Sequence, residues 1–193
     1  MPTYLITGAS RGIGLELTKQ LLSLPSTTVS KVFALSRGTP SSGIQSLLTK
    51  HPDRLSYITA SVTDTNSVHK AAEEVAAQLQ GKGLDVLVNN AGTQNWNEGG
   101  ISKLEEQDLM SVFDLNVVGV QRVTAAFLPL LEKGGEKKVV NMYVSFHLIF
   151  LNHSPTVPST HSGKSCAAQR VVHQCITSFR RDDCPMLTWI LCA

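Results

Sequence analysis

The sequence contains little charge and few aromatic residues. Charged side chains make up 17% and aromatic side chains 6% of its 193 residues. The 17 basic and 15 acidic residues are scattered along the chain and leave a net charge of +2. The chain has no basic stripe of the kind that follows nucleic-acid phosphates, so we expect no nucleic-acid partner.

An export signal and a long apolar run are also missing. The N-terminus has no basic leader followed by an apolar stretch and a small-residue cleavage site, and no segment approaches the length needed to cross a bilayer. We therefore expect a cytoplasmic protein without membrane contact. Its four cysteines, which lie between Cys166 and Cys192, are then expected to be reduced thiols.

No metal site is predicted. The irregular cysteine spacing does not match paired CxxC zinc ligands. The histidines of the same stretch share neither helical i,i+4 spacing nor nearby carboxylates; they are His147, His153, His161 and His173.

What the chain does contain is a regular alternation of short apolar runs and amphipathic stretches. Hydrophobic residues make up 42% of the sequence, enough for one buried core, so residues 1–193 are predicted to form a single domain. The alternation predicts βαβ units, and hence a doubly wound parallel sheet in a three-layer α/β/α arrangement.

The expected elements follow from apolar periodicity and from turn residues. Strands are predicted at residues 3–7, 31–36, 55–60, 84–88, 138–142 and 186–191. Helices are predicted at 13–24, at 41–50, from a Thr63 cap to Gly81, from Glu105 or Asp108 to Leu128 with an end near Pro129, and at 164–179.

A glycine-rich turn joins the first predicted strand to the first helix. Glycines allow a sharp turn and a close backbone approach to a pyrophosphate, and the free amides of a helix start attract the anion. A glycine cluster alone also fits an ordinary strand-to-helix turn. The turn reads Thr7, Gly8, Ala9, Ser10, Arg11, Gly12, Ile13, Gly14.

This spacing resembles the TGxxxGxG motif of the short-chain dehydrogenase/reductase family, and the resemblance implies a Rossmann-type fold in which the turn binds a cofactor pyrophosphate. A second motif follows the strand at 84–88. Asn89, Asn90, Ala91 and Gly92 match the family's NNAG motif, which steadies the sheet and lines the adenosine side of the cofactor.

The end of the second strand indicates NADP(H) rather than NAD(H). An acidic residue at this point usually binds the adenine-ribose hydroxyls of NAD, but here the strand ends in Leu35, Ser36 and Arg37. A guanidinium suits a phosphate dianion, so Arg37 favours the 2′-phosphate of NADP. Arg11 is a second cation for the same phosphate; the alternative for both arginines is a solvated surface charge.

Residues after the third strand look like the family's adenine-contact segment. Val62 and Asp64 are the predicted contacts, although Asp64 could simply cap the next helix. Ser61 stands at a position that is usually Asp in the family.

The resemblance also implies three active-site residues. Asn116 lies in a segment resembling the one that bears the family's active-site asparagine, Ser145 stands for its carbonyl-polarising serine, and Lys164 for its lysine. The family places a tyrosine four residues before that lysine as the acid. Here Thr160 stands there, and a threonine hydroxyl is too short and too weakly acidic to replace a phenol.

The family likeness extends over residues 1–142, whereas residues 143–193 diverge. Their only acidic residues are Asp182 and Asp183. Together with the missing tyrosine and the end at Ala193, where the family continues, this leads to the hypothesis of a truncated chain that lacks the last strand and whose final fifty or so residues derive from a shifted frame or alternative splice.

Two functions remain open at this stage. One is an NADP(H)-dependent reductase of a small carbonyl or alcohol substrate, similar to fungal ketoreductases that act on polyketides. The other is a catalytically impaired NADP-binding module, and a chain with an exposed sheet edge could also fold poorly. The family's paired long helices imply a homo-oligomer.

Overall fold

The core of the molecule is a parallel β-sheet. The computed structural model describes residues 1–94, 103–143 and 188–192. Six strands lie in the order β3-β2-β1-β4-β5-β6, and every neighbouring pair is parallel. The strands are β1 (Thr3–Thr7), β2 (Lys31–Ser36), β3 (Leu55–Thr59), β4 (Val86–Asn89), β5 (Lys138–Tyr143) and β6 (Thr188–Cys192).

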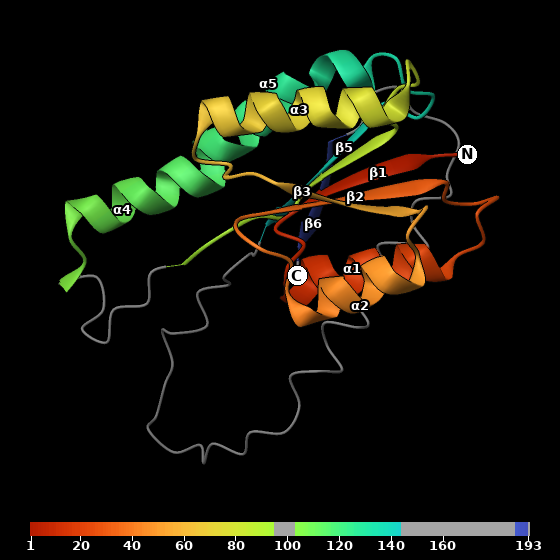
Figure 1. The fold of residues 1–193 in the computed structure, drawn as a ribbon. Coiled ribbons are helices and arrows are strands. Elements are labelled where there is room, and N and C mark those ends of the chain that lie inside the picture. Colours follow the sequence, from red (N-terminus) through yellow and green to blue (C-terminus); the bar gives the residue numbers. More distant parts are fainter. Residues whose placement is uncertain (95–102, 144–187, 193) are drawn as a thin grey trace.

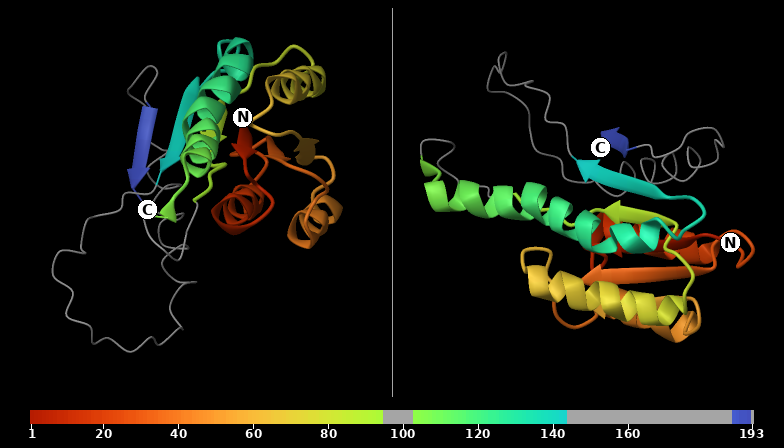
Figure 2. Two further views of the ribbon diagram at one scale, coloured as in Figure 1. Left: turned by 90° about the vertical axis from the view of Figure 1, so that its left-hand side faces the viewer. Right: turned by 90° about the horizontal axis from the view of Figure 1, so that it is seen from above.

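Helices cover both faces of this sheet (Figures 1 and 2). Helices α1 (Gly12–Ser23) and α2 (Ser42–Lys50) lie on one face, and α3 (Thr65–Leu79) and α5 (Gly119–Leu131) on the other. The α4 helix (Glu106–Phe113) leads into α5 through a π-helical segment, η2 (Asp114–Val118). The predicted doubly wound α/β fold is therefore confirmed.

The alternation of side chains along each strand produces two cores. Leu5 of β1 packs in the cluster beneath α3 and α5, whereas its neighbour Ile6 packs in the cluster beneath α1 and α2. Both side chains are fully buried. A strand that is buried on both faces needs apolar residues at successive positions, which explains its continuous apolar run.

Several predicted boundaries differ from the structure. The cap of α3 is Asp64, whose carboxylate accepts a hydrogen bond from the Asn66 amide, and not Thr63. The fourth strand starts at Val86 instead of Leu84, because the Leu84 amide donates to the Leu130 carbonyl at the end of α5. The chain is so close here that a Cβ on Gly83 would lie 2.0 Å from the Gly134 amide nitrogen, so position 83 has no room for a side chain.

One long helix was predicted from Glu105 or Asp108 to Leu128, with an end near Pro129. The structure confirms an end close to Pro129 but divides the helix into segments. The π segment interrupts it, with the Gly119 amide donating to the Asp114 carbonyl five residues back. Pro129 lies inside α5, which ends at Leu131. The predicted helix at 164–179 and the first two residues of the strand predicted at 186–191 lie outside the described residues.

The two ends of α1 differ in their hydrogen bonding. At its C-terminal end the Arg54 guanidinium donates to the carbonyls of Leu22 and Leu24 at 3.0 and 2.9 Å. A cation at this end also complements the helix dipole. At its N-terminal end Arg11 is the cap residue, and its side chain makes no capping hydrogen bond.

Asp85 joins the amino ends of the central strands, at the opposite end of the strands from the glycine turn. One carboxylate oxygen accepts from the Thr3 amide and hydroxyl at 2.8 and 3.0 Å. The other accepts from the Gly135 and Glu136 amides at 2.7 and 3.3 Å. One side chain thus joins the chain start, β4 and the turn before β5.

Within the described residues, no helix is both long and apolar enough to cross a membrane.

We predict that Asp85→Ala lowers the free energy of unfolding by about 2 kcal/mol, because a carboxylate with charge-assisted hydrogen bonds is removed and its donors lose their acceptor. Urea denaturation followed by circular dichroism measures the change. The matched control is Asp53→Ala, which removes an exposed carboxylate and should change stability by less than about 0.5 kcal/mol. Equal effects of the two substitutions would contradict the joining role of Asp85.

Candidate functional site

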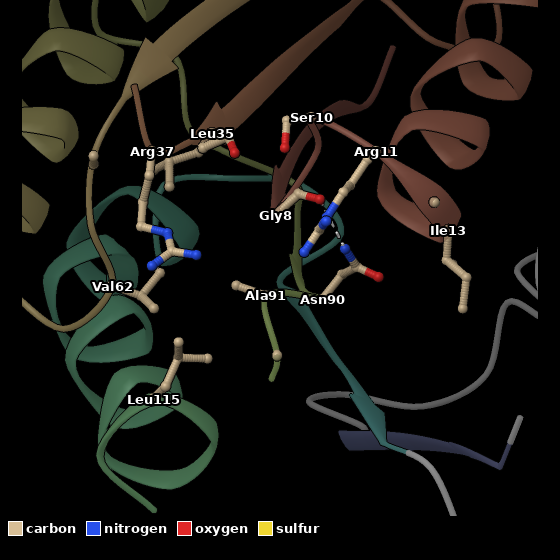
Figure 3. A pocket seen from close by; sticks show the side chains of 14 residues that line it. Gly8, Ser10, Arg11, Ile13, Leu35, Arg37, Val62, Asn90, Ala91 and Leu115 are labelled. Atoms are coloured by element: carbon tan, nitrogen blue, oxygen red, sulfur yellow. Dashed lines mark hydrogen bonds between the residues drawn. The ribbon is translucent and has the colours of Figure 1, made fainter. Parts of the chain in front are cut away.

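A pocket opens at the carboxyl ends of β1, β2 and β4, where the strand order reverses direction. In open parallel sheets this is the position at which ligands bind. Most of its wall is formed by the glycine turn after β1, the end of β2 with Arg37, and the loop after β4 (Figure 3). The lining residues are Gly8, Ser10, Arg11, Gly12, Ile13, Leu35, Ser36, Arg37, Ala60, Val62, Asn90, Ala91, Gly92 and Leu115.

The glycine turn fits closely against the segment that follows β4. Gly8 has a φ of +68°, and a Cβ on it would lie 2.8 Å from the Ala91 Cα. A Cβ on Gly14 would lie 2.5 Å from both the Asn90 Nδ2 and the Gly8 oxygen. Glycine is therefore required at both positions by space, and at Gly8 by backbone conformation as well.

Thr7 and Asn90 hold this contact in place with hydrogen bonds. The Thr7 hydroxyl oxygen accepts from the Asn90 and Ala91 amides, both at 3.0 Å. The Asn90 side-chain amide donates back to the carbonyls of Thr7 at 2.9 Å and Gly8 at 3.3 Å. The two loops that flank the crevice thus form one rigid unit.

The start of α1 lines this pocket, and its cap residue makes no side-chain hydrogen bond to the helix. The cap residues of α2 and α3, Ser41 and Asp64, accept hydrogen bonds with their side chains, whereas the cap residue of α1, Arg11, makes no such bond. The first turn of α1 contains no acidic residue. A Cβ on Gly12 would meet no described atom within 4 Å, so there is open space beside this glycine. The arrangement suits an anion such as a pyrophosphate.

Two arginines extend over the same pocket from its two sides (Figure 3). Arg11 comes from the glycine turn and Arg37 from the end of β2, and both are exposed. Neither makes an ion pair with a carboxylate within the described residues. Among the described residues, no Asp or Glu lines the pocket. The rim is therefore positive and open to a second anionic group.

Val62 forms another part of the pocket wall, and α5 packs against it on the side away from the pocket. A Cβ on Gly119 would lie 3.2 Å from a Val62 methyl group, so the helix passes in close contact. The Arg122 guanidinium donates to the Val62 carbonyl at 3.4 Å and pairs with Asp114 at 2.7 Å. This fixes an apolar surface suited to one face of a flat ring.

Most of the predicted cofactor residues surround this one pocket. Gly14 lies beneath it, against Asn90, and Asp64 does not line it but caps α3. Leu35, Ala60 and Leu115 line it and were missed. The positions of Leu35 and Ala60, at the ends of two parallel strands, could have indicated this.

Asn116 lies at the centre of the π segment and is tied to the loop after β4. Its side-chain oxygen accepts from the Thr93 amide at 2.9 Å, and its side-chain nitrogen donates to the Thr93 carbonyl at 2.8 Å. The side chain therefore acts as a brace between helix and loop. Ser145 and Lys164, the other two predicted active-site residues, lie outside the described residues, as does Thr160.

Neither Tyr4 nor Tyr57 has the properties of a general acid near neutral pH. Burial, followed by the charges of Glu136 and Asp85, raises the pKa of Tyr4 to about 12, and this residue lies at the start of β1, far along the strand from the pocket. Burial also raises the pKa of Tyr57, although a hydrogen bond with Ser36 acts in the opposite direction.

The described part of the chain contains no cluster of three or more potential metal ligands.

Fold and pocket together define an α/β protein with a doubly wound parallel sheet and a pocket at the start of its first helix. The family model described as short chain dehydrogenase matches residues 2–147. The chain belongs to the short-chain dehydrogenase family, whose members are oxidoreductases that bind a nicotinamide cofactor.

Relatives with this architecture come from fungi, plants and animals. A short-chain dehydrogenase/reductase of Aspergillus aculeatus is 40% identical over 153 residues, which cover 74% of this chain and 54% of the relative. An NADPH-dependent pterin aldehyde reductase of Arabidopsis thaliana is 34% identical over 141 residues, which cover 72% and 55%.

Among solved structures, the NADPH-bound carbonyl reductase from chicken fatty liver superposes with a TM-score of 0.67 at 33% identity and covers 74% of this chain and 59% of that one. The chain thus spans about half the length of the curated relatives that it matches.

We predict that Gly14→Ala destabilises the fold by about 1–3 kcal/mol, because the new methyl group overlaps the Asn90 amide and the Gly8 carbonyl. Thermal unfolding should show a fall of several degrees. Gly92→Ala is the matched control, since its Cβ would be 3.5 Å from the nearest neighbour, an ordinary contact. A Gly14 variant that melts like the control would show that the close contact is not required.

Proposed function

We propose that the pocket binds NADP(H) in preference to NAD(H). The observation that carries the proposal is the pair of exposed arginines, Arg11 and Arg37, at the rim of a pocket that no carboxylate of the described residues lines. An adenosine 2′-phosphate carries two negative charges at neutral pH, and a guanidinium can bind it with two parallel hydrogen bonds. The NADPH named for the chicken and Arabidopsis relatives supports this choice.

The residues of the pocket divide between the parts of such a cofactor. The amides of Gly12 and Ile13 at the uncapped helix start would hold the pyrophosphate. Val62 would contact the adenine ring, and Ser36 with the two arginines would hold the phosphorylated ribose. The bound cofactor supplies a hydride equivalent, while the protein orients it and supplies protons.

We further propose a ketone of a small or polyketide-like molecule as the substrate. Reduction adds a hydride to the carbonyl carbon and a proton to its oxygen. Asn116, Ser145 and Lys164 are the residues proposed to serve this step, with Asn116 and Lys164 holding a proton-relay water and Ser145 polarising the carbonyl. Thr160 stands where the family has its tyrosine, so the proposed site contains no phenol at that position to protonate the carbonyl oxygen.

A second candidate is a module that binds NADP(H) without turnover. The absence of a phenol at Thr160 favours it, as do the raised pKa values of Tyr4 and Tyr57, which leave neither of them able to donate a proton readily near neutral pH.

We predict that Arg37→Asp weakens NADPH binding by roughly 100-fold and NADH binding by less than about threefold, because the lost charge-assisted hydrogen bonds involve only the 2′-phosphate. Titration calorimetry with both cofactors measures this. Lys70→Asp on α3 is the control, since it makes the same charge change at an exposed cation outside the pocket. Equal losses for both cofactors in Arg37→Asp would contradict NADP(H) specificity.

Turnover separates the two candidate functions. We expect the wild-type chain to oxidise NADPH with aromatic ketones or quinones slowly, and Thr160→Tyr to increase the rate by about 100-fold or more by restoring a general acid. Absorbance at the reduced-nicotinamide band measures the rate, and Thr160→Phe controls for ring size without a hydroxyl. Tight NADPH binding with no turnover in any of these variants would favour the binding module.

A further inference from the structure

Ser41 joins the start of α2 to the glycine turn. Its hydroxyl donates to the Ser10 carbonyl at 2.6 Å, and the same oxygen accepts from the Ile44 amide at 3.4 Å. The Ser10 carbonyl belongs to the peptide bond that leads into Arg11. Because Gly43 has no side chain, α2 can lie against Leu15 of α1; a Cβ there would be 2.8 Å from a Leu15 methyl group.

Tyr57 makes an equivalent contact on the other side of the pocket. Its hydroxyl donates at 2.9 Å to the carbonyl of Gly38, the residue that follows Arg37, and the Thr59 hydroxyl lies 3.5 Å from the same carbonyl. Gly38 has a φ of +69°, so the chain turns sharply there. The phenol on β3 therefore fixes the turn directly after the second arginine.

Each of the two segments that carry an arginine thus has a carbonyl group occupied by a hydroxyl donor from a neighbouring element. A third bond, from the Ala9 amide to the Leu35 carbonyl at 3.2 Å, links the segments to each other. An arginine side chain loses rotamer freedom when it binds a ligand. The total entropy cost of binding is smaller if the backbone that carries the arginine is already fixed, so affinity for the ligand rises. Occupied carbonyl groups also present less negative potential to an approaching phosphate.

We propose that the hydroxyl groups of Ser41 and Tyr57 are positioning groups for cofactor specificity: they fix the backbone from which Arg11 and Arg37 reach the adenosine 2′-phosphate. This inference rests on the proposed NADP(H) preference. Neither residue lines the pocket. Ser41 acts through the segment that carries Arg11, and Tyr57 acts through the segment that carries Arg37, to which its hydrogen-bond partner Ser36 also belongs.

The experiment measures dissociation constants of NADPH and NADH for the full-length chain by titration calorimetry. The ratio of the two constants is the readout, because a general loss of stability weakens the binding of both cofactors equally and leaves their ratio unchanged. Ser41→Ala and Tyr57→Phe should each reduce the preference for NADPH by roughly three- to tenfold, the range expected for one hydrogen bond. Ser41→Thr keeps the hydroxyl and should retain the wild-type ratio.

Two controls test whether the effect passes through the arginines. Thr49→Ala removes another hydroxyl-to-carbonyl bond of α2, to Gln45, far from the pocket, and should leave the ratio unchanged. In an Arg11→Ala background, Ser41→Ala should have no further effect on the ratio. Tyr57→Phe should likewise have none in an Arg37→Ala background.

The outcomes distinguish this inference from the proposal beneath it. A wild-type chain that binds NADPH and NADH equally would overturn the cofactor assignment. A clear wild-type preference that persists unchanged in Ser41→Ala and Tyr57→Phe would overturn the positioning role alone. So would a reduced ratio that persists in the arginine-free backgrounds, since the hydroxyl groups would then act by another route.

Discussion

The contact between the glycine turn after β1 and the Asn90 amide after β4 is the constraint on which the rest of the pocket depends. Asn90 donates to the carbonyls of Thr7 and Gly8, and the space it occupies excludes any side chain at Gly14. Because the two loops leave adjacent parallel strands, this contact determines where α1 begins. The direction of its first amides, and the point from which Arg11 extends, follow from that position.

Much of this arrangement could be predicted from sequence because it relies on local rules. The first two strands have the predicted bounds, since each is a short apolar run ended by turn residues. The glycine turn and Asn90 were also identifiable, because their residue types are required by close approach and not merely preferred. By contrast, Asp64 and Thr63 are both good cap residues, and only the backbone path of the loop selects Asp64.

Features that depend on long-range contacts were not predictable in this way. The π segment around Asn116 has no distinctive composition, and the apolar periodicity of the long helix continues through it. Its position becomes understandable only when Asn116 is seen bonded to Thr93, a residue from another loop. Pro129 was expected to end the helix, but it lies on an exposed face only two residues before the end, where water can reach the carbonyl that it leaves unpaired.

The two ends of α1 are finished differently, and the difference links folding to ligand binding. Arg54 donates to carbonyls at its C-terminal end, whereas the cap residue at its N-terminal end, Arg11, makes no side-chain hydrogen bond to the helix. An anion at that end completes the hydrogen bonding of the helix as a cap residue would. Any ligand that does so binds the native state and not the unfolded chain, so resistance to unfolding grows with the logarithm of its concentration above the dissociation constant. The abundance of the folded protein in a cell would then follow the supply of such a ligand.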